Sequence, residues 1–163
     1  MVYGQGIMDL PRESKSPFYI RWMSMIQRCY DKGSLERDPS YIGVSVCEEW
    51  LTFSNFRDWM ETKDWEGKCL DKDLKGGSEY SPDTCVFISG DLNRYWTMNR
   101  KGISWEEDRQ KWRVKIGRKH IGRYGSETEA RKVYESCKVE GLKDFLGKES
   151  LEVDEVLRSI IYK

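Results

Sequence analysis

The chain has 163 residues, a length that suits one domain of ordinary size or two small ones. Aromatic residues make up 13% of it, which excludes a disordered chain because such chains are poor in aromatic side chains. The formal net charge is zero, and neither an apolar run long enough to span a membrane nor an N-terminal secretion signal occurs. We therefore expect a cytoplasmic protein without a membrane partner.

The five cysteines are odd in number, and no two of them are spaced as a CxxC pair. Zinc sites use close pairs of Cys or His ligands, and the sequence has a single histidine, His120. Reduced, mostly buried thiols are therefore expected rather than a zinc site.

Charge is unevenly spread along the chain. Residues 1–93 contain 11 Lys and Arg against 16 Asp and Glu, whereas residues 94–143 contain 14 against 7. Such asymmetry favours a nucleic-acid-binding module beside an acidic one, although a basic solvated face is the simpler alternative.

The first elements are helical. Ser16 and Pro17 mark the start of a helix whose apolar stripe includes Trp22 and Ile26, and Gly33 is placed to end it. A short strand is expected around Val44 to Val46. A second helix should follow, with Ser54 as its cap.

Residues 70–93, "LDKDLKGGSEYSPDTCVFISGDLN", read as a strand, a turn-rich connection, a second strand and the start of a helix. Three short strands follow in "KGISW", "KWRVKIG" and "KHIGRYG". Apolar and basic residues alternate in the middle strand, which predicts a sheet with one apolar face and one cationic face.

A helix begins after that sheet at a capping box formed by Ser126 and Glu129. Its apolar residues recur at helical spacing and should pack on the sheet. The tail "SLEVDEVLRSIIYK" predicts an amphipathic helix, which could close the domain or form a homodimer.

Residues 100–146 resemble the AP2 family of DNA-binding domains. The resemblance rests on the opening "GISW", the strand "KWRVKI" and the junction "HIGRYGSETEA". It implies sequence-directed binding of double-stranded DNA through the cationic face of the sheet. Glu106, Glu107 and Asp108 would repel phosphate, so we expect them either to point away from DNA or to weaken binding. The candidate DNA-binding residues are Arg100, Lys101, Trp105, Arg109, Lys111, Arg113, Lys115, Arg118, Lys119 and Arg123.

Residues 17–93 resemble phage-encoded HNH-endonuclease-like proteins through "RWMSMIQRCY", "GVSVCEEWLTFSNFRDWM", "LDKDL" and "YSPDTCVFI". An active site of that family implies a metal ion on the scissile phosphate and a neutral His that accepts a proton from water. Here Lys72 follows Asp71 where relatives have His. In relatives the orienting Asn falls at or next to Thr84, where this chain has no Asn, and Asn93 occupies the last ligand position.

Two readings of this stretch compete. Asp71 and Asn93, with Asp73 nearby, could still ligate Mg²⁺ or Mn²⁺ and support slow cleavage, which makes Asp71, Lys72, Asp73 and Asn93 the catalytic candidates. A protonated Lys72 cannot act as a base but could hold phosphate together with Arg94 and Arg100. The missing base and the missing Asn favour the second, non-cleaving reading. Asp71 and Asp73 could also simply flank a tight turn.

The sequence therefore predicts an α+β protein. Residues 1–98 would form an HNH-like part containing a ββα unit, residues 99–147 an AP2-like sheet packed on one helix, and residues 148–163 a terminal helix. We expect a double-stranded DNA-binding protein derived from a homing-type HNH endonuclease, acting as a repressor or site competitor in a bacterial host cell, with no cofactor needed for binding. A divergent metal-dependent nickase and an inhibitor of another protein are the alternatives.

Overall fold

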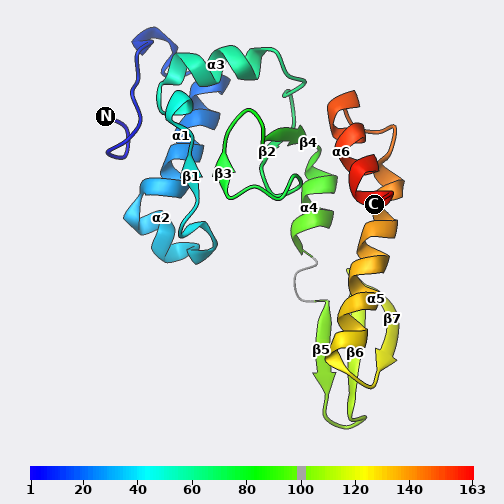
Figure 1. Ribbon diagram of the computed structural model, residues 1–163. Coiled ribbons are helices and arrows are strands. Elements are labelled where there is room, and N and C mark those ends of the chain that lie inside the picture. Colours follow the sequence, from blue (N-terminus) through cyan, green and yellow to red (C-terminus); the bar gives the residue numbers. More distant parts are fainter. Residues whose placement is uncertain (99–101) are drawn as a thin grey trace. The chain divides into compact units, whose positions relative to one another are not determined.

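The computed structural model describes residues 1–98 and 102–163, and it is a mixed α+β structure, as the sequence predicts (Figure 1). The chain divides into two compact units, Met1–Phe87 and Ile88–Lys163. The sequence suggested a boundary after residue 98 instead. The difference lies in helix α4 (Gly90–Met98), which belongs to the second unit.

Helix α1 (Pro17–Tyr30) begins where the sequence predicts, because the Ser16 hydroxyl accepts a hydrogen bond from the backbone N–H of Tyr19. Its end differs from the prediction. Asp31 follows α1 directly, and its carboxylate caps a further helix, α2 (Lys32–Arg37), by accepting from the N–H and hydroxyl of Ser34. Gly33 therefore lies inside α2 and does not end α1.

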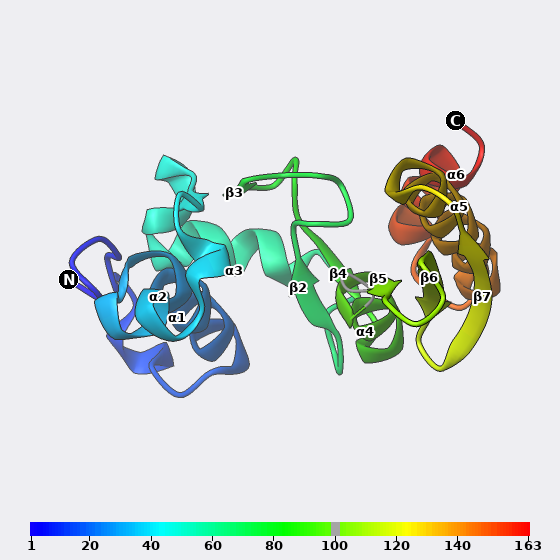
Figure 2. The ribbon, with the colours of Figure 1, turned by 90° about the horizontal axis from the view of Figure 1, so that it is seen from below.

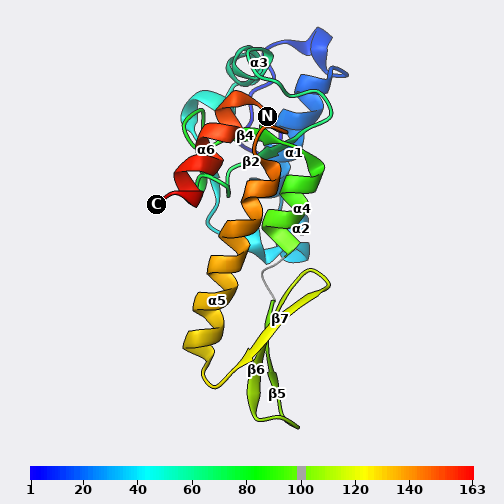
Figure 3. The ribbon, with the colours of Figure 1, turned by 90° about the vertical axis from the view of Figure 1, so that its right-hand side faces the viewer.

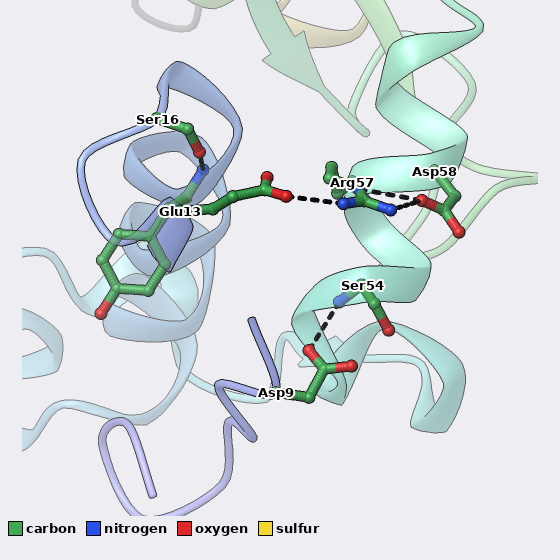
Figure 4. Close-up of polar contacts among 7 residues, drawn as sticks. Asp9, Glu13, Ser16, Ser54, Arg57 and Asp58 are labelled. Carbon is green, nitrogen blue, oxygen red and sulfur yellow. Dashed lines mark hydrogen bonds and ion pairs between the residues drawn. The ribbon is translucent and has the colours of Figure 1, made fainter. Parts of the chain in front are cut away.

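Helix α3 (Phe53–Glu61) begins one residue before the predicted cap, Ser54. The backbone N–H of Ser54 donates instead to the carboxylate of Asp9, 3.0 Å away (Figure 4). Arg57 on the same helix pairs with Glu13, with 2.6 Å between Nη1 and Oε1. These contacts hold the N-terminal segment against α3, a link between distant residues that no local pattern could reveal.

The core of the first unit is aromatic. Trp22 of α1 is completely buried beside Phe53, and its indole N–H donates to the carbonyl of Trp50 at 2.7 Å. Helices α1 and α3 pack against each other (Figure 2), and the centres of the Trp22 and Phe53 rings, one from each helix, are 5.5 Å apart. Cys29 and Cys85 are buried free thiols, and burial raises their pKa to about 11 and about 12, which keeps them protonated and unreactive.

The strands of this region are short. Strand β1 (Ser45–Val46) pairs in parallel with β3 (Glu79–Tyr80), and β2 (Cys69–Asp71) pairs with β4 (Val86–Ile88). Strand β3 lies in the connection that the sequence assigned to turns. Its pairing joins segments far apart in the chain and fixes the position of the loop that follows β2.

In the second unit, β5 (Ile103–Glu106), β6 (Lys111–Ile116) and β7 (Lys119–Tyr124) form an antiparallel sheet, and helix α5 (Glu127–Glu140) lies along one face of it (Figure 3). Val114 is completely buried against Ala130 and Tyr134 of α5. Gly102 is required for this packing, since a Cβ atom there would lie 2.2 Å from the ring of Tyr134.

Helix α5 begins at the predicted cap, where the Ser126 hydroxyl accepts from the N–H of Glu129. Near its end, α4 packs against it. The Tyr95 hydroxyl donates to the carbonyl of Lys138, and the Lys138 ammonium lies 4.5 Å from the centre of the Trp96 ring. These contacts explain why α4 belongs to the second unit.

The terminal helix α6 (Leu151–Ile161) is capped by Ser150 and buries Val153 and Leu157 within the second unit. It therefore closes this unit, as one of the two sequence expectations proposed. Within the described residues, every helix is too short or too polar to cross a membrane.

Replacing Trp22 by Ala should lower the free energy of unfolding by about 3–5 kcal/mol, because the change leaves a large cavity and an unpaired carbonyl in the aromatic core. Ile20→Ala on the same helix is the matched control. Ile20 is 52% exposed, and its change should stay within about 0.5 kcal/mol. Urea unfolding of both variants would measure the difference, and equal shifts would contradict the assigned core.

Candidate functional site

The pairing register of the second unit's sheet sorts its side chains onto two faces. Residues directly opposite each other on neighbouring strands project from the same face. Ile103 lies opposite Val114, so both face α5, whereas Arg113 lies opposite both Ser104 and Arg123. We call the face turned away from α5 the open face. It carries Ser104, Glu106, Lys111, Arg113, Lys115, His120 and Arg123.

A register shift between Val114 and Lys115 changes the order of faces on β7. Beyond it, Lys115 lies opposite His120, and a 3.3 Å contact between His120 Nε2 and Arg123 Nη1 places both on the open face. Ile121 packs on the helix side, and Lys119 pairs with Ile116 there. The bulge thus brings the histidine beside the cations and turns Lys119 away from them.

The centre of the open face is an ion-pair network around Glu106. Its Oε1 forms an ion pair with Arg113 Nη1 at 3.0 Å, and its Oε2 accepts a hydrogen bond from Arg123 Nε. Arg109 Nε lies 4.0 Å from Oε2. The hydrogen bond from Arg123, together with these neighbouring charges, holds the pKa of Glu106 below its ordinary range, so the carboxylate stays ionised.

This position of Glu106 corrects one expectation. The sequence placed Glu106, Glu107 and Asp108 together in a turn that points away from DNA. Glu106 is instead the last residue of β5 and lies among the arginines of the open face. Glu107 is directed away from the open face, because it accepts from the indole N–H of Trp105 on the other side of the sheet.

The other candidate DNA-binding residues divide into three groups. Lys111, Arg113, Lys115 and Arg123 come together on the open face. Arg109 lies in the turn at its end and Arg118 in the exposed β6–β7 turn. Trp105 lies opposite Trp112 on the helix side, where it is 40% exposed, and Lys119 also lies on that side. Arg100 and Lys101 fall outside the described residues.

The open face can bind an anion with several N–H donors at once. Cations outnumber carboxylates among its described residues, and the side chains of Arg113 and Arg123 each remain 33% exposed. Arginine presents its donors in a planar fork that fits phosphate oxygens and the guanine edge. The open face therefore suits a polyanion whose acceptor atoms are regularly spaced and lie on flat edges.

The candidate site of the first unit is closed rather than open. Lys72 is only 7% exposed. Its ammonium pairs with Asp73 at 2.7 Å and lies 5.8 Å and 5.6 Å from the ring centres of Tyr41 and Tyr80. A carboxylate and two aromatic faces thus replace the water that the ammonium loses. This geometry turns Lys72 into the unit and away from a phosphate in solvent.

Asp71 is also buried. Its Oδ1 accepts from the N–H of Leu74 at 2.8 Å, and burial raises its pKa to about 6. One oxygen each of Asp71 and Asp73 is therefore engaged by the protein itself. This contact matches the turn reading of Asp71, in which the carboxylate closes the loop after β2.

The other two positions of the expected site are Thr84 and Asn93. The Thr84 hydroxyl donates to the carbonyl of Glu79 at 2.6 Å and so serves the β3–β4 loop. Asn93 lies on helix α4. No cluster of three or more His, Cys, Asp or Glu side chains suited to a metal ion occurs among the described residues.

Sequence reasoning missed two residues of the open face, Glu106 and His120. Strict alternation from Arg123 would place His120 on the helix side, and only the register shift moves it. A signal was nevertheless present, because "HIGRYG" puts Ile121 two residues before Arg123, where alternation would put an apolar side chain on the cationic face. A conflict of this kind is typical of a bulge.

Comparison of the chain with protein-family models, with curated proteins and with solved structures gave no match.

The burial of Asp71 predicts a pH-dependent stability. The folded chain holds this proton up to about pH 6, whereas the unfolded chain releases it near pH 4, so unfolding should become easier as pH rises through that window. Asp71→Asn removes the titration and keeps an oxygen to accept from Leu74. The variant should therefore gain stability over the wild type by about 2–3 kcal/mol between pH 4 and pH 7.

Urea midpoints across that pH range would measure this gain. Asp83→Asn is the control, because Asp83 is exposed in the same part of the chain and should follow the wild-type profile. A parallel profile for Asp71→Asn would show that Asp71 is ionised throughout, as a metal ligand would be.

Proposed function

We propose that the chain binds double-stranded DNA through the open face of the β5–β6–β7 sheet. The single observation that carries this proposal is the gathering of Lys111, Arg113, Lys115 and Arg123 on the face that α5 does not cover. Phosphate contacts from such side chains supply affinity, and guanidinium forks supply base recognition in the major groove. The groove is wide enough to admit strands of a sheet.

The resemblance of residues 100–146 to AP2 domains supports the same proposal, because those domains bind DNA through an antiparallel sheet backed by a helix. The arrangement of β5, β6, β7 and α5 is compatible with that architecture. The uneven charge of the sequence also agrees, since the basic residues concentrate in residues 94–143.

The first unit is proposed to be the remnant of a homing-type HNH endonuclease that no longer cleaves. Lys72 stands where that family has its base, and its burial against Asp73, Tyr41 and Tyr80 gives it a packing role. A protein that occupies a site without cutting it would act as a repressor or as a competitor for a related endonuclease. Its place of action would be the cytoplasm of a bacterial host.

Reversing two charges of the open face, with Arg113→Glu and Lys115→Glu together, should weaken binding to a random-sequence duplex by at least about 100-fold. The slope of log affinity against log salt should become shallower by about 2, one unit for each lost phosphate contact. Fluorescence anisotropy over a salt series would measure both quantities, and a urea midpoint would check that the variant is folded.

The matched control carries Lys132→Glu and Lys148→Glu. It has the same net charge as the test variant, but both changes lie at exposed positions of the second unit outside the open face. It should bind within about threefold of the wild type, with an unchanged salt slope. Equal losses in the two variants would mean that net charge, not this face, governs binding.

A further inference from the structure

We propose that Glu106 is a positioning residue that trades overall DNA affinity for base discrimination. It would hold the guanidinium groups of Arg113 and Arg123 in fixed directions, so that the open face reads guanine in the major groove. This inference rests on the proposed function and adds to it a role for an acidic residue on a surface that binds a polyanion.

The geometry of the carboxylate supports this role. Each of its oxygens pairs with a different arginine, Oε1 with Arg113 and Oε2 with Arg123. The Glu106 side chain is 14% exposed, less than half the exposed fraction of either arginine. The two arginine side chains therefore shield much of the Glu106 side chain from solvent.

Register explains why a carboxylate is needed there. Arg113 and Arg123 lie directly opposite each other on β6 and β7, and like charges in that relation repel. Without a shared anion the two side chains would swing apart into solvent and lose a common orientation. Glu106 offsets the repulsion and ties both groups to the end of β5.

The atoms that Glu106 uses decide what remains for DNA. It accepts from the Nε of Arg123, so the terminal Nη groups are the donors of that residue that remain for DNA. His120 lies 3.3 Å from one of them and limits the rotation of the guanidinium further. A planar pair of N–H donors held in one direction is the group that matches the O6 and N7 acceptors of guanine. Of the two arginines, Arg123 should therefore discriminate guanine from other bases more strongly.

The same carboxylate must weaken contacts that do not depend on sequence. A negative charge among the cations repels nearby phosphates whatever the base sequence is. Removing it should raise affinity for random DNA while the arginine directions become free and discrimination falls. A role in folding alone would lower both affinity and discrimination. Simple repulsion alone would raise the affinity for motif and random DNA equally and leave discrimination unchanged.

The experiment selects bound duplexes from a randomised library with the wild type, Glu106→Gln and Glu106→Ala, and measures affinity for the unselected library. The wild type should enrich a motif with fixed guanines. Glu106→Ala should bind the unselected library several-fold more tightly and lose at least about tenfold of the preference for the motif. Glu106→Gln keeps hydrogen-bond acceptance and should fall between the two.

Glu135→Gln is the matched control, since it removes the same charge from an exposed side chain of α5, which covers the other face of the sheet. It should keep the full preference for the motif. Enrichment of the same motif to the same degree by Glu106→Ala would overturn the inference, as would wild-type binding without any motif. Failure of the wild type to retain duplex DNA at all would instead overturn the proposed function.

Discussion

The packing of α5 on the β5–β6–β7 sheet is the constraint on which the rest of the second unit depends. Val114 is buried against Ala130 and Tyr134, and Gly102 lets Tyr134 approach closely enough to close this contact. Because side chains alternate along a strand, burying one set forces the neighbouring set to the other face. The basic side chains of β6 therefore lie together on the open face because the apolar ones are buried in the core. The surface that we propose to bind DNA needs no further structural support.

In the first unit, charged side chains are buried inside the fold instead of being displayed on an open face. Asp71 ends β2 and Lys72 follows it, and both side chains are buried with partners from their surroundings. Such groups are costly to bury and are tolerated only when their hydrogen bonds and charges are met. Their contacts stabilise the loop that follows β2.

Sequence patterns predicted the elements that depend on local chemistry. The start of α1 at Ser16, the start of α5 at Ser126 and the basic alternation of β6 all follow from neighbouring residues. The misplaced features depend on distant ones. Asp9 reaches α3 from far away in the chain, β1 and β3 pair across a long loop, and α4 joins the second unit through Tyr95 and Lys138. The network around Glu106 needs three strands in register, so no single segment could indicate it.

Backbone amide chemical shifts of the full chain, recorded during titration with a short duplex, test the central claim most directly. The account predicts saturable shifts at Arg113, Lys115 and Arg123 and at neighbouring β5–β7 residues, with α6 and the Trp22 core left unchanged. Shifts confined to the first unit, with the open face unaffected, would contradict it.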